Sequence, residues 1–487
     1  MKKGEVYTGT VISQEFPNKC KIKIDGEELL VHSKGGLVGQ VVEVRVTKKR
    51  SDKGEGNILS VISKADNEIE PICPHFSICG GCSYQNLAYD DQKTMKNQML
   101  RDVLENVVDN EIRKNPGLGI EAQGYFDSIY EGVVGSPVHE EYRNKMEFSF
   151  GDSCKGGELE LGLHKKGSFY DIVSVKDCQI VDADYRAILS ETLSYFRGKE
   201  CTYFHKLNHE GFLRHLVIRK AVKTGEILVN LVTSSQIPND TPCTEVSIIE
   251  DWKEAILSLS FKGKIAGIVH TINDSLSDVV QADKINILYG QDYFYEELLG
   301  LKFKISPFSF FQTNSLGAEV LYSKARDYIF DGALDEGKKS DKIVYDLYSG
   351  TGTIAQLIAP VAKKVIGVEI IEEAVVAARD NAKLNGLDNC EFIAGDVLKA
   401  LDDITEKPDF IILDPPRDGV HPKALRKIID YGVDNIIYIS CKPTSLARDF
   451  ETLIGCGYVP VKICGVDQFP QTVHVETVCL LSRKAPV

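Results

Sequence analysis

The stretch Asp346-Leu-Tyr-Ser-Gly-Thr-Gly-Thr353-Ile-Ala355 decides the fold of the C-terminal part of this chain. It overlaps the apolar run Ile343–Leu347, which predicts a buried strand, and its glycines allow a sharp turn from that strand into a helix. Glycines also let a ligand approach the backbone closely. The string Gly350-x-Gly352-x-x-Ala355 fits a dinucleotide-binding fingerprint as well, so the turn alone leaves the ligand open.

From about residue 341 onward, apolar runs alternate with helical segments. This alternation predicts a doubly wound parallel sheet with an antiparallel strand near the end of the chain. The expected strands are Ile343–Leu347, Lys364–Glu369, Cys390–Ile393, Phe410–Leu413, Ile436–Ser440, Val459–Cys464 and Val473–Leu481, with a helix around Glu372–Asn385.

Acidic residues stand at three successive strand ends. Glu369 could accept hydrogen bonds from both hydroxyls of an adenosine ribose, and Asp396 could accept one from an adenine amino group, although both would also suit NAD. Asp414 precedes Pro415-Pro416, whose fixed φ angles hold it in one geometry at the sheet edge. Methyltransferases that act on base amino groups carry a similar segment followed by an aromatic residue. Here Arg417 follows, which favours methylation of carbon over nitrogen.

Cys441 lies between the strand Ile436–Ser440 and the start of a helix, where the helix dipole and Lys442 are expected to lower the thiol pKa. A thiolate that adds to carbon 6 of uracil makes carbon 5 nucleophilic toward a sulfonium methyl group. A base must then remove the carbon 5 proton, and Glu476 is the candidate. Each residue alone would be unremarkable for a strand end, but together with Asp414 at one sheet edge they predict catalysis.

At these residues the chain resembles the RNA uracil-5-methyltransferase family, in particular its 23S ribosomal RNA branch. The motifs that carry the resemblance are Phe310–Asn314, Asp346–Thr353, Asp414–Arg417, Ser440–Asp449 and His474–Glu476. The resemblance implies S-adenosylmethionine as cofactor, Cys441 as nucleophile and Glu476 as proton acceptor. It also implies the side chains that surround the cofactor and the flipped uracil: Gln312, Tyr348, Thr353, Glu369, Asp396 and Asp414.

The first 66 residues form short alternating segments separated by glycine-containing and charged turns, which predicts a small OB-like antiparallel barrel. They hold twelve Lys and Arg against nine Asp and Glu, whereas the whole chain has a net charge of −14. Local patches govern binding to phosphates, so the acidic total does not exclude RNA. The barrel resembles a TRAM domain, an RNA-binding module. We therefore expect RNA as partner, ribosomal RNA above all, bound through a single-stranded loop with a flipped uridine.

Several basic residues of the central region could contact RNA or could equally be solvated surface charges. They are Arg143, Lys145, Arg214, His215 and Arg219.

The thirteen cysteines follow no secretory signal, which predicts reduced thiols and a cytoplasmic location. Cys73-x5-Cys79-Gly-Gly-Cys82 places three of them in ten residues. Zinc usually takes its ligands as two close pairs, so this spacing favours a [4Fe–4S] cluster over zinc. The family resemblance implies Cys178 as the fourth ligand. Methyl transfer needs no electron, so we expect the cluster to be structural.

These observations predict a multidomain α/β protein. We expect a TRAM-like barrel at 1–66, a mainly β central domain with the iron–sulfur loop at 67–305, and a class I Rossmann-like methyltransferase domain at 306–487. A helix at about 90–108 could pack on the last of these. No apolar run approaches the length of about 18 residues that spans a membrane, so we expect no membrane contact. A monomer is expected.

Other functions compete with this interpretation. A tRNA uracil-5-methyltransferase would use the same chemistry, and a non-catalytic RNA-binding factor for ribosome assembly would need the barrel and the cysteine loop but not Cys441 with Glu476. A DNA cytosine-5-methyltransferase carries its nucleophile after a proline at the fourth strand, where this chain has Asp414. An NAD-dependent oxidoreductase would leave Cys441 and the cysteine loop without a purpose.

Overall fold

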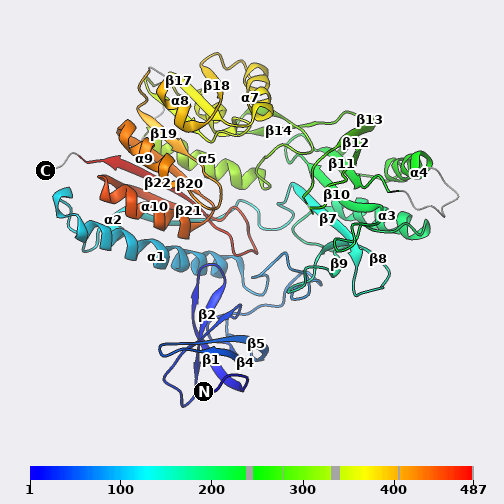
Figure 1. The fold of residues 1–487 in the computed structure, drawn as a ribbon, viewed down its shortest axis with the longest axis horizontal. Helices are drawn as coiled ribbons and strands as arrows, with labels where there is room; N and C mark the ends of the chain where they lie inside the picture. The colour runs from blue at the N-terminus through cyan, green and yellow to red at the C-terminus, as the bar shows by residue number, and fades with distance from the viewer. Residues whose placement is uncertain (237–244, 278, 331–339, 404–405, 485–487) are drawn as a thin grey trace.

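The structure is a computed structural model that describes residues 1–484 except 237–244, 278, 331–339 and 404–405. Three β-structures follow one another along the chain: a closed barrel, a seven-stranded sheet and an eight-stranded sheet flanked by helices (Figure 1). Among the helices in the described ranges, none combines the length and the apolar character that crossing a membrane requires.

The N-terminal barrel closes in the order β1-β2-β3-β5-β4. Side chains alternate between its interior and the solvent, as in β4, where Val42, Val44 and Val46 are fully buried. The structure confirms the predicted small barrel, which has five strands, but β3 and β5 pair in parallel where an antiparallel barrel was expected. Its strands are β1 (Val6–Glu15), β2 (Lys19–Ile24), β3 (Val31–Lys34), β4 (Val41–Lys49) and β5 (Gly54–Ser63).

The central sheet has the order β13-β12-β11-β10-β7-β8-β9. The helices α3 (Ala183–Gly198) and α4 (Glu245–Leu257) pack on it, and their buried Phe196 and Trp252 share one apolar core with its strands. The strands are β7 (Lys145–Asp152), β8 (Leu159–His164), β9 (Ile172–Ser174), β10 (Leu213–Lys220), β11 (Glu226–Thr233), β12 (Lys264–Ile272) and β13 (Lys284–Gly290).

The eight-stranded sheet has the order β18-β17-β16-β19-β20-β22-β21-β6. The first five strands are parallel and β22 is antiparallel to β20, which confirms the predicted doubly wound arrangement with an antiparallel strand near the end. The strands are β6 (Tyr130–Val134), β16 (Ile343–Leu347), β17 (Lys364–Glu369), β18 (Cys390–Ala394), β19 (Phe410–Leu413), β20 (Asn435–Ser440), β21 (Tyr458–Val466) and β22 (Glu476–Arg483).

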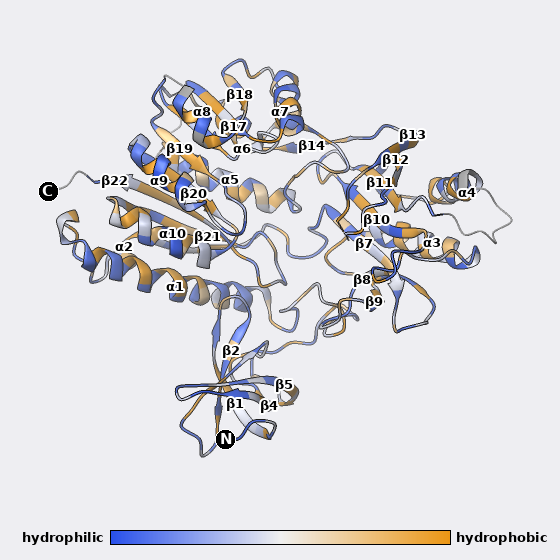
Figure 2. Ribbon diagram, viewed as in Figure 1, coloured by the Kyte–Doolittle hydropathy of each residue, from blue (hydrophilic) through white to orange (hydrophobic). Residues whose placement is uncertain are grey.

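Helices cover both faces of this sheet, and the strands between them are largely hydrophobic (Figure 2). Burial on both faces explains why its parallel strands are continuous apolar runs. The helices are α5 (Ser315–Phe330), α6 (Thr353–Ile358), α7 (Glu372–Leu384), α8 (Val397–Asp403), α9 (Pro422–Tyr431) and α10 (Pro443–Gly455). The hairpin β14 (Phe294–Leu298) and β15 (Leu301–Ile305) leads into α5.

The long helix α1 (Tyr89–Lys114) packs along α10, and α2 (Tyr125–Ile129) and β6 complete that side of the eight-stranded sheet. A short 3-10 turn at Pro116–Leu118 follows α1. The apolar stripe of α1 includes Leu100 and Leu104, which are fully buried in the core of this sheet. Residues 89–134 therefore belong spatially to the C-terminal sheet, although they precede the seven-stranded sheet in the chain.

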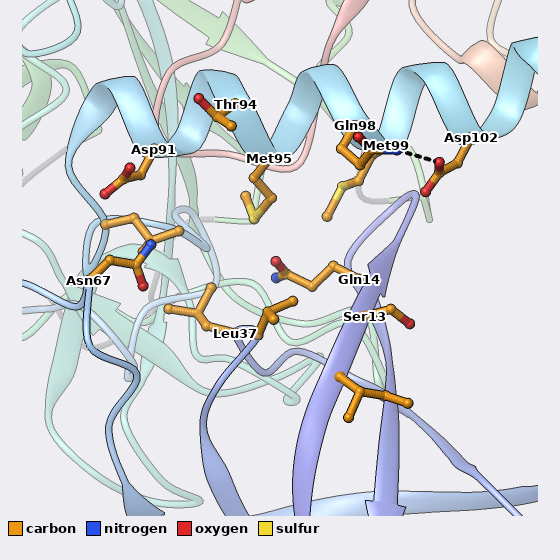
Figure 3. Close-up of a pocket in the computed structure, with 13 residues that line it drawn as sticks. Ser13, Gln14, Leu37, Asn67, Asp91, Thr94, Met95, Gln98, Met99 and Asp102 are labelled. Atoms are coloured by element: carbon orange, nitrogen blue, oxygen red, sulfur yellow. Dashed lines mark hydrogen bonds between the residues drawn. The ribbon is translucent and has the colours of Figure 1, made fainter.

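The barrel meets the N-terminal half of α1 around a cavity of about 430 Å³ (Figure 3). Gln14 of β1 and Leu37, which follows β3, lie opposite Met95 and Met99 of α1. The helix thus contacts the barrel on one side and the eight-stranded sheet on the other.

The basic residues of β10 are buried, which corrects both interpretations offered for them. Arg214, His215 and Arg219 are only 2–3% exposed. Arg214 donates hydrogen bonds to the carbonyls of Asn273 and Ser275, and Arg219 donates to that of Ser309. Because β10 lies between β7 and β11 in the middle of its sheet, these side chains tie loops to the sheet and cannot meet RNA.

Candidate active site

A cavity of about 600 Å³ opens at the carboxyl ends of the parallel strands. This is where doubly wound sheets bind their ligands, and the volume is in the range of small-molecule sites. Six of the eight residues predicted for catalysis and cofactor binding line it, namely Gln312, Tyr348, Thr353, Asp414, Cys441 and Glu476.

The glycine turn after β16 forms one wall of this cavity. Gly352 has a φ of 72°, and a Cβ there would lie 2.4 Å from the Phe392 ring, so only glycine fits. At Gly350, φ is 53° and a Cβ would meet nothing within 4 Å. The turn therefore packs tightly against the sheet at Gly352 and leaves its backbone open to a ligand at Gly350.

The two predicted acids outside the cavity lining adjoin it through residues that do line it. Glu369 accepts hydrogen bonds from the backbone N–H groups of Gly350 and Ile371, each at 3.0 Å. Asp396 lies close enough to Tyr348 for its charge, after burial, to raise the pKa of that phenol. Both carboxylates thus stand next to the open turn.

Two carboxyl groups, Asp414 and Glu476, line the cavity, and a third, Asp346, is buried behind its lining. Burial raises the pKa of Asp414 to about 7. Burial and then the charge of Asp414 raise the pKa of Glu476 and of Asp346, each to about 8. Groups that repel one another in a desolvated site keep protons near neutral pH. These groups can therefore both take up and release protons at physiological pH.

Strand pairing places Cys441 in this acidic corner. Ser440 of β20 pairs with Thr477 of β22, so the next residue on one strand and the preceding residue on the other, Cys441 and Glu476, adjoin. Burial, followed by the charges of Glu476 and Asp414, raises the pKa of the Cys441 thiol to about 11. The expectation of a lowered thiol pKa was wrong, because carboxylates and burial outweigh the helix start and Lys442.

Other side chains complete the walls. Arg143 and Arg417 line the cavity, and Arg417 acts against the rise in pKa of both Cys441 and Glu476. His474 also lines it, and burial together with nearby cations lowers its pKa to about 4, so it is neutral. Arg143, Arg417 and His474 were not predicted as catalytic or cofactor residues, whereas Asp346 is buried behind the lining, where it accepts a hydrogen bond of 3.0 Å from the Ala355 N–H.

The motif Phe310–Asn314 brings Gln312 into the cavity. The Gln312 side chain hydrogen-bonds the hydroxyl of Tyr322. The backbone carbonyl of Gln312 accepts a hydrogen bond of 2.9 Å from the Asn144 side-chain amide. Phe310 at the same wall is 69% exposed. The motif therefore joins the central sheet to the cavity.

The four predicted cluster ligands, Cys73, Cys79, Cys82 and Cys178, line one small pocket. The backbone N–H of Gly81 donates to the Cys79 sulfur and the Gln85 side chain to the Cys82 sulfur, each at 3.3 Å. Within the described ranges, no three or more His, Cys, Asp or Glu side chains are arranged to hold a metal ion. The structure thus brings the four thiols to one place without itself defining a metal centre.

A doubly wound sheet with a glycine turn after its first strand, carboxylates at the following strand ends and an antiparallel last strand defines the class of S-adenosylmethionine-dependent methyltransferases. Comparison with known proteins agrees. Residues 245–484 match the family model described as tRNA (Uracil-5-)-methyltransferase.

RNA methyltransferases of Clostridium tetani and Caldanaerobacter subterraneus are 50% and 45% identical to the chain, and each alignment covers 99% of the chain and 99–100% of the relative. The structure also matches the tRNA (uracil-54, C5)-methyltransferase of Pyrococcus abyssi, solved with S-adenosyl-L-homocysteine. That match has a TM-score of 0.68, 25% identity and coverage of 97% of this chain and 100% of the other. The chain belongs to the RNA methyltransferases, its residues 245–484 match the tRNA (uracil-5-)-methyltransferase model, and S-adenosylmethionine is its methyl donor.

Proposed function

We propose that this enzyme methylates carbon 5 of a uridine in 23S ribosomal RNA through a covalent adduct with Cys441. The observation that carries the proposal is the meeting of Cys441, Glu476 and Asp414 in one cavity with the glycine turn. Neither an oxidoreductase nor a non-catalytic RNA-binding protein needs a thiol beside two carboxyl groups at this position.

The reaction divides between these residues as follows. The Cys441 thiolate adds to carbon 6 of the uracil, and the ring becomes an enolate whose carbon 5 is nucleophilic. S-adenosylmethionine supplies an electrophilic methyl group that carbon 5 takes, with loss of the neutral thioether. Glu476 then removes the carbon 5 proton, the bond from carbon 6 to sulfur breaks, and Cys441 leaves as a thiolate.

The raised pKa values mean that the resting enzyme must ionise both its nucleophile and its base before the reaction. With a thiol pKa of about 11 and a Glu476 pKa of about 8, both groups are largely protonated at pH 7. A positive charge that enters the cavity stabilises the ionised forms and lowers these pKa values. The sulfonium of the methyl donor carries such a charge, so donor binding activates the nucleophile and the base together.

The cofactor contacts are part of the same proposal. Tyr348, Thr353 and Gln312 line the cavity, and Glu369 and Asp396 stand beside the open turn at Gly350. Glu369 would hold the ribose hydroxyls and Asp396 the adenine amino group.

We further propose that Cys73, Cys79, Cys82 and Cys178 hold a [4Fe–4S] cluster. Four thiols around one pocket are the donor set of such a cluster, and N–H groups directed at ligand sulfurs accompany it. The apolar side chains of Leu163, Val175 and Ile180 close the pocket. The cluster would fix the 73–82 loop against β8, to which Gly80 and Lys166 already attach it by backbone hydrogen bonds.

The choice of ribosomal RNA rests on the resemblance of the sequence motifs to the 23S branch, and the barrel, which we propose to be a TRAM domain, supports RNA binding in general. Transfer RNA is the second candidate, because the Pyrococcus abyssi enzyme that this structure resembles is a tRNA methyltransferase.

The test is to map 5-methyluridine in 23S ribosomal RNA and in transfer RNA from a strain that lacks the protein and from the same strain carrying it on a plasmid. We expect one or more 23S sites to lose and regain the methyl group. A loss confined to transfer RNA would move the proposal to the second candidate, and unchanged 5-methyluridine in both would contradict it.

A further inference from the structure

The loop of residues 467–475, between β21 and β22, forms a wall of the active-site cavity. Phe469, Thr472 and His474 line the cavity, and His474 lies near Arg143 and Arg417, whose charges help to lower its pKa. Inside the loop, the Thr472 hydroxyl donates to the Phe469 carbonyl at 2.8 Å and accepts from the His474 N–H. The loop is therefore a structured wall that carries none of the proposed cofactor contacts.

Helix α1 holds this loop at two points with side chains one turn apart. The Lys96 ammonium lies 2.6 Å from Asp467, and both side chains are at most 1% exposed. The Gln92 amide donates to the Gln471 side chain at 2.8 Å and accepts from the Gln471 N–H at 3.0 Å. Residues four apart on a helix share a face, so one face of α1 contacts the loop at both Asp467 and Gln471.

The segment that follows the cysteine loop (residues 73–82) also contacts Gln471. The backbone N–H groups of Ser83 and Tyr84, which directly follow Cys82, both donate to the Gln471 carbonyl, at 2.8 and 3.1 Å. Gln471 itself is 9% exposed and has a φ of 68°. A left-handed glutamine is uncommon and persists only where its surroundings determine it.

The motif Phe310–Asn314 fixes the start of the loop. Asn314 is fully buried and donates to the Gln468 carbonyl at 3.0 Å, while the Gln468 amide donates to the Asn314 carbonyl at 3.0 Å. Each long polar side chain of this network is buried and makes at least one hydrogen bond within the protein, although Asp467 Oδ2 and Gln468 Oε1 have none in the described part of the chain. Such a buried network is sensitive to the loss of one member.

We infer that Gln471 is a positioning residue that couples the four-cysteine site to the RNA-side wall of the active-site cavity. It joins the segment after Cys82, the α1 helix and the loop that carries Phe469, Thr472 and His474. The inference rests on the proposed function, because that function makes this wall the binding surface for the flipped base. None of the proposed cofactor contacts lies on this loop, so the coupling acts on RNA binding; Gln312, which adjoins the loop through Asn314, is the contact whose state cofactor binding reports.

The test compares the full-length wild type with Gln471→Gly, because glycine accepts the left-handed backbone and removes only the side chain. The matched control is Glu200→Gly, at an exposed residue with a φ of 53°. The readouts are iron and sulfide content, the Kd for S-adenosylhomocysteine, kcat and KM for an RNA transcript that wild type methylates, and the yield of covalent adduct with its 5-fluorouridine form.

For Gln471→Gly we expect wild-type iron and sulfide content, a cofactor Kd within about twofold, and a fall in kcat/KM for RNA of about 10- to 100-fold, carried by KM and by adduct yield. The control keeps all four values. Gln92→Ala should reproduce the defect. The double variant of Gln92→Ala and Gln471→Gly should be as active as the less active of the two single variants, because both substitutions remove the same pair of amide side chains.

The link to the cysteines is tested by Cys82→Ser, which should show the same RNA defect with cofactor binding retained, and no further loss when combined with Gln471→Gly. Wild-type KM and adduct yield in Gln471→Gly, or equal losses of RNA and cofactor binding, would overturn the inference. If Cys82→Ser fails to fold, wild-type protein depleted of iron with a chelator takes its place, and an unchanged KM for RNA after iron loss would overturn the inference. Absence of methyl transfer by the wild type itself would instead refute the proposed function.

Discussion

Two groups of cysteines in this protein occupy opposite surroundings. Cys441 is partly exposed at the end of β20, among carboxyl groups that keep its thiol protonated. The four cysteines at 73–82 and 178 line an apolar pocket where N–H groups point at two of the sulfurs. Burial also raises the pKa of Cys82 to about 12 and that of Cys178 to about 11, as high as that of Cys441, so neither site holds a thiolate unaided. The two sites differ in what can stabilise a thiolate: N–H donors beside a proposed metal cluster at one, and the positive charge of the methyl donor among carboxyl groups at the other. These surroundings support the proposals of metal ligands at the first site and of a nucleophile at the second.

Removal of the nucleophile should have the largest effect. We expect Cys441→Ala to lower methyl transfer by at least about 10⁴-fold, because no other group can form the adduct at carbon 6. Transfer of labelled methyl groups to RNA measures it, and cofactor binding should persist. Cys456→Ala, at a free cysteine of similar exposure near the end of α10, should keep wild-type activity.

Removal of the base should come next. We expect Glu476→Gln to lower turnover by about 10²- to 10⁴-fold, since proton removal from carbon 5 is lost while addition of Cys441 is retained. The methylated RNA should therefore stay attached to the protein and be visible on denaturing gels with ordinary uridine. Glu451→Gln, on the exposed face of α10, is the control. Free methylated RNA produced by Glu476→Gln at the wild-type rate would assign the base elsewhere.

The ligand cysteines can be compared within one core. Cys178→Ala should remove iron and sulfide and lower the thermal midpoint by several degrees, because a lost cluster leaves three unpartnered thiols in a buried pocket. Cys201→Ala lies in the same apolar core but outside the pocket and should keep full iron content. Equal iron content in both variants would contradict the proposed cluster.

Alkylation should measure the ionisation of the Cys441 thiol directly. With a pKa of about 11, the thiolate fraction of Cys441 rises about tenfold per pH unit between pH 7 and 9. Its reaction with iodoacetamide, followed by mass spectrometry at that residue, should rise in parallel. Sinefungin, which carries a positive charge where the donor has its sulfonium, should accelerate the reaction more than neutral S-adenosylhomocysteine does. Identical rates with both ligands would contradict charge-assisted activation.

The smallest effect concerns stability. The pKa of Glu476 is raised from 4.5 to about 8 in the folded protein, so the folded state binds the proton more tightly than the unfolded state. Its contribution is fully favourable below pH 4.5 and is lost as pH rises through 8. Glu476→Gln should therefore stabilise the protein at pH 8 by up to about 4 kcal/mol and hardly at all at pH 4.5. Urea unfolding at both pH values measures this difference.

Much of the fold followed from local patterns. Apolar runs bounded by turns predicted the parallel strands, because strands buried on both faces are continuously apolar, and alternating segments predicted the barrel, whose strands are buried on one face only. The membership of α1 and β6 in the C-terminal sheet had no such signal, since it depends on contacts with α10 and β21 more than 300 residues away.

The site was partly predictable for the same reason. Strand-end positions brought Asp414, Cys441 and Glu476 together as expected. The sign of the thiol pKa shift was missed, because it depends on burial and on carboxylates from other strands rather than on the adjacent residue. The burial of Arg214 and Arg219 was also missed, since a charged residue in a strand is usually exposed and only the two neighbouring strands reveal otherwise.

Covalent catalysis by Cys441 is tested most directly with RNA transcribed with 5-fluorouridine, which cannot lose a proton from carbon 5. In the presence of S-adenosylmethionine, we expect a stable complex of protein and RNA. Mass spectrometry should show the modified nucleotide attached to Cys441. The complex should be absent with Cys441→Ala and unaffected by Cys456→Ala. A wild-type protein that methylates uridine at carbon 5 but forms no adduct with the fluorinated RNA, or an adduct that persists in Cys441→Ala, would contradict the account.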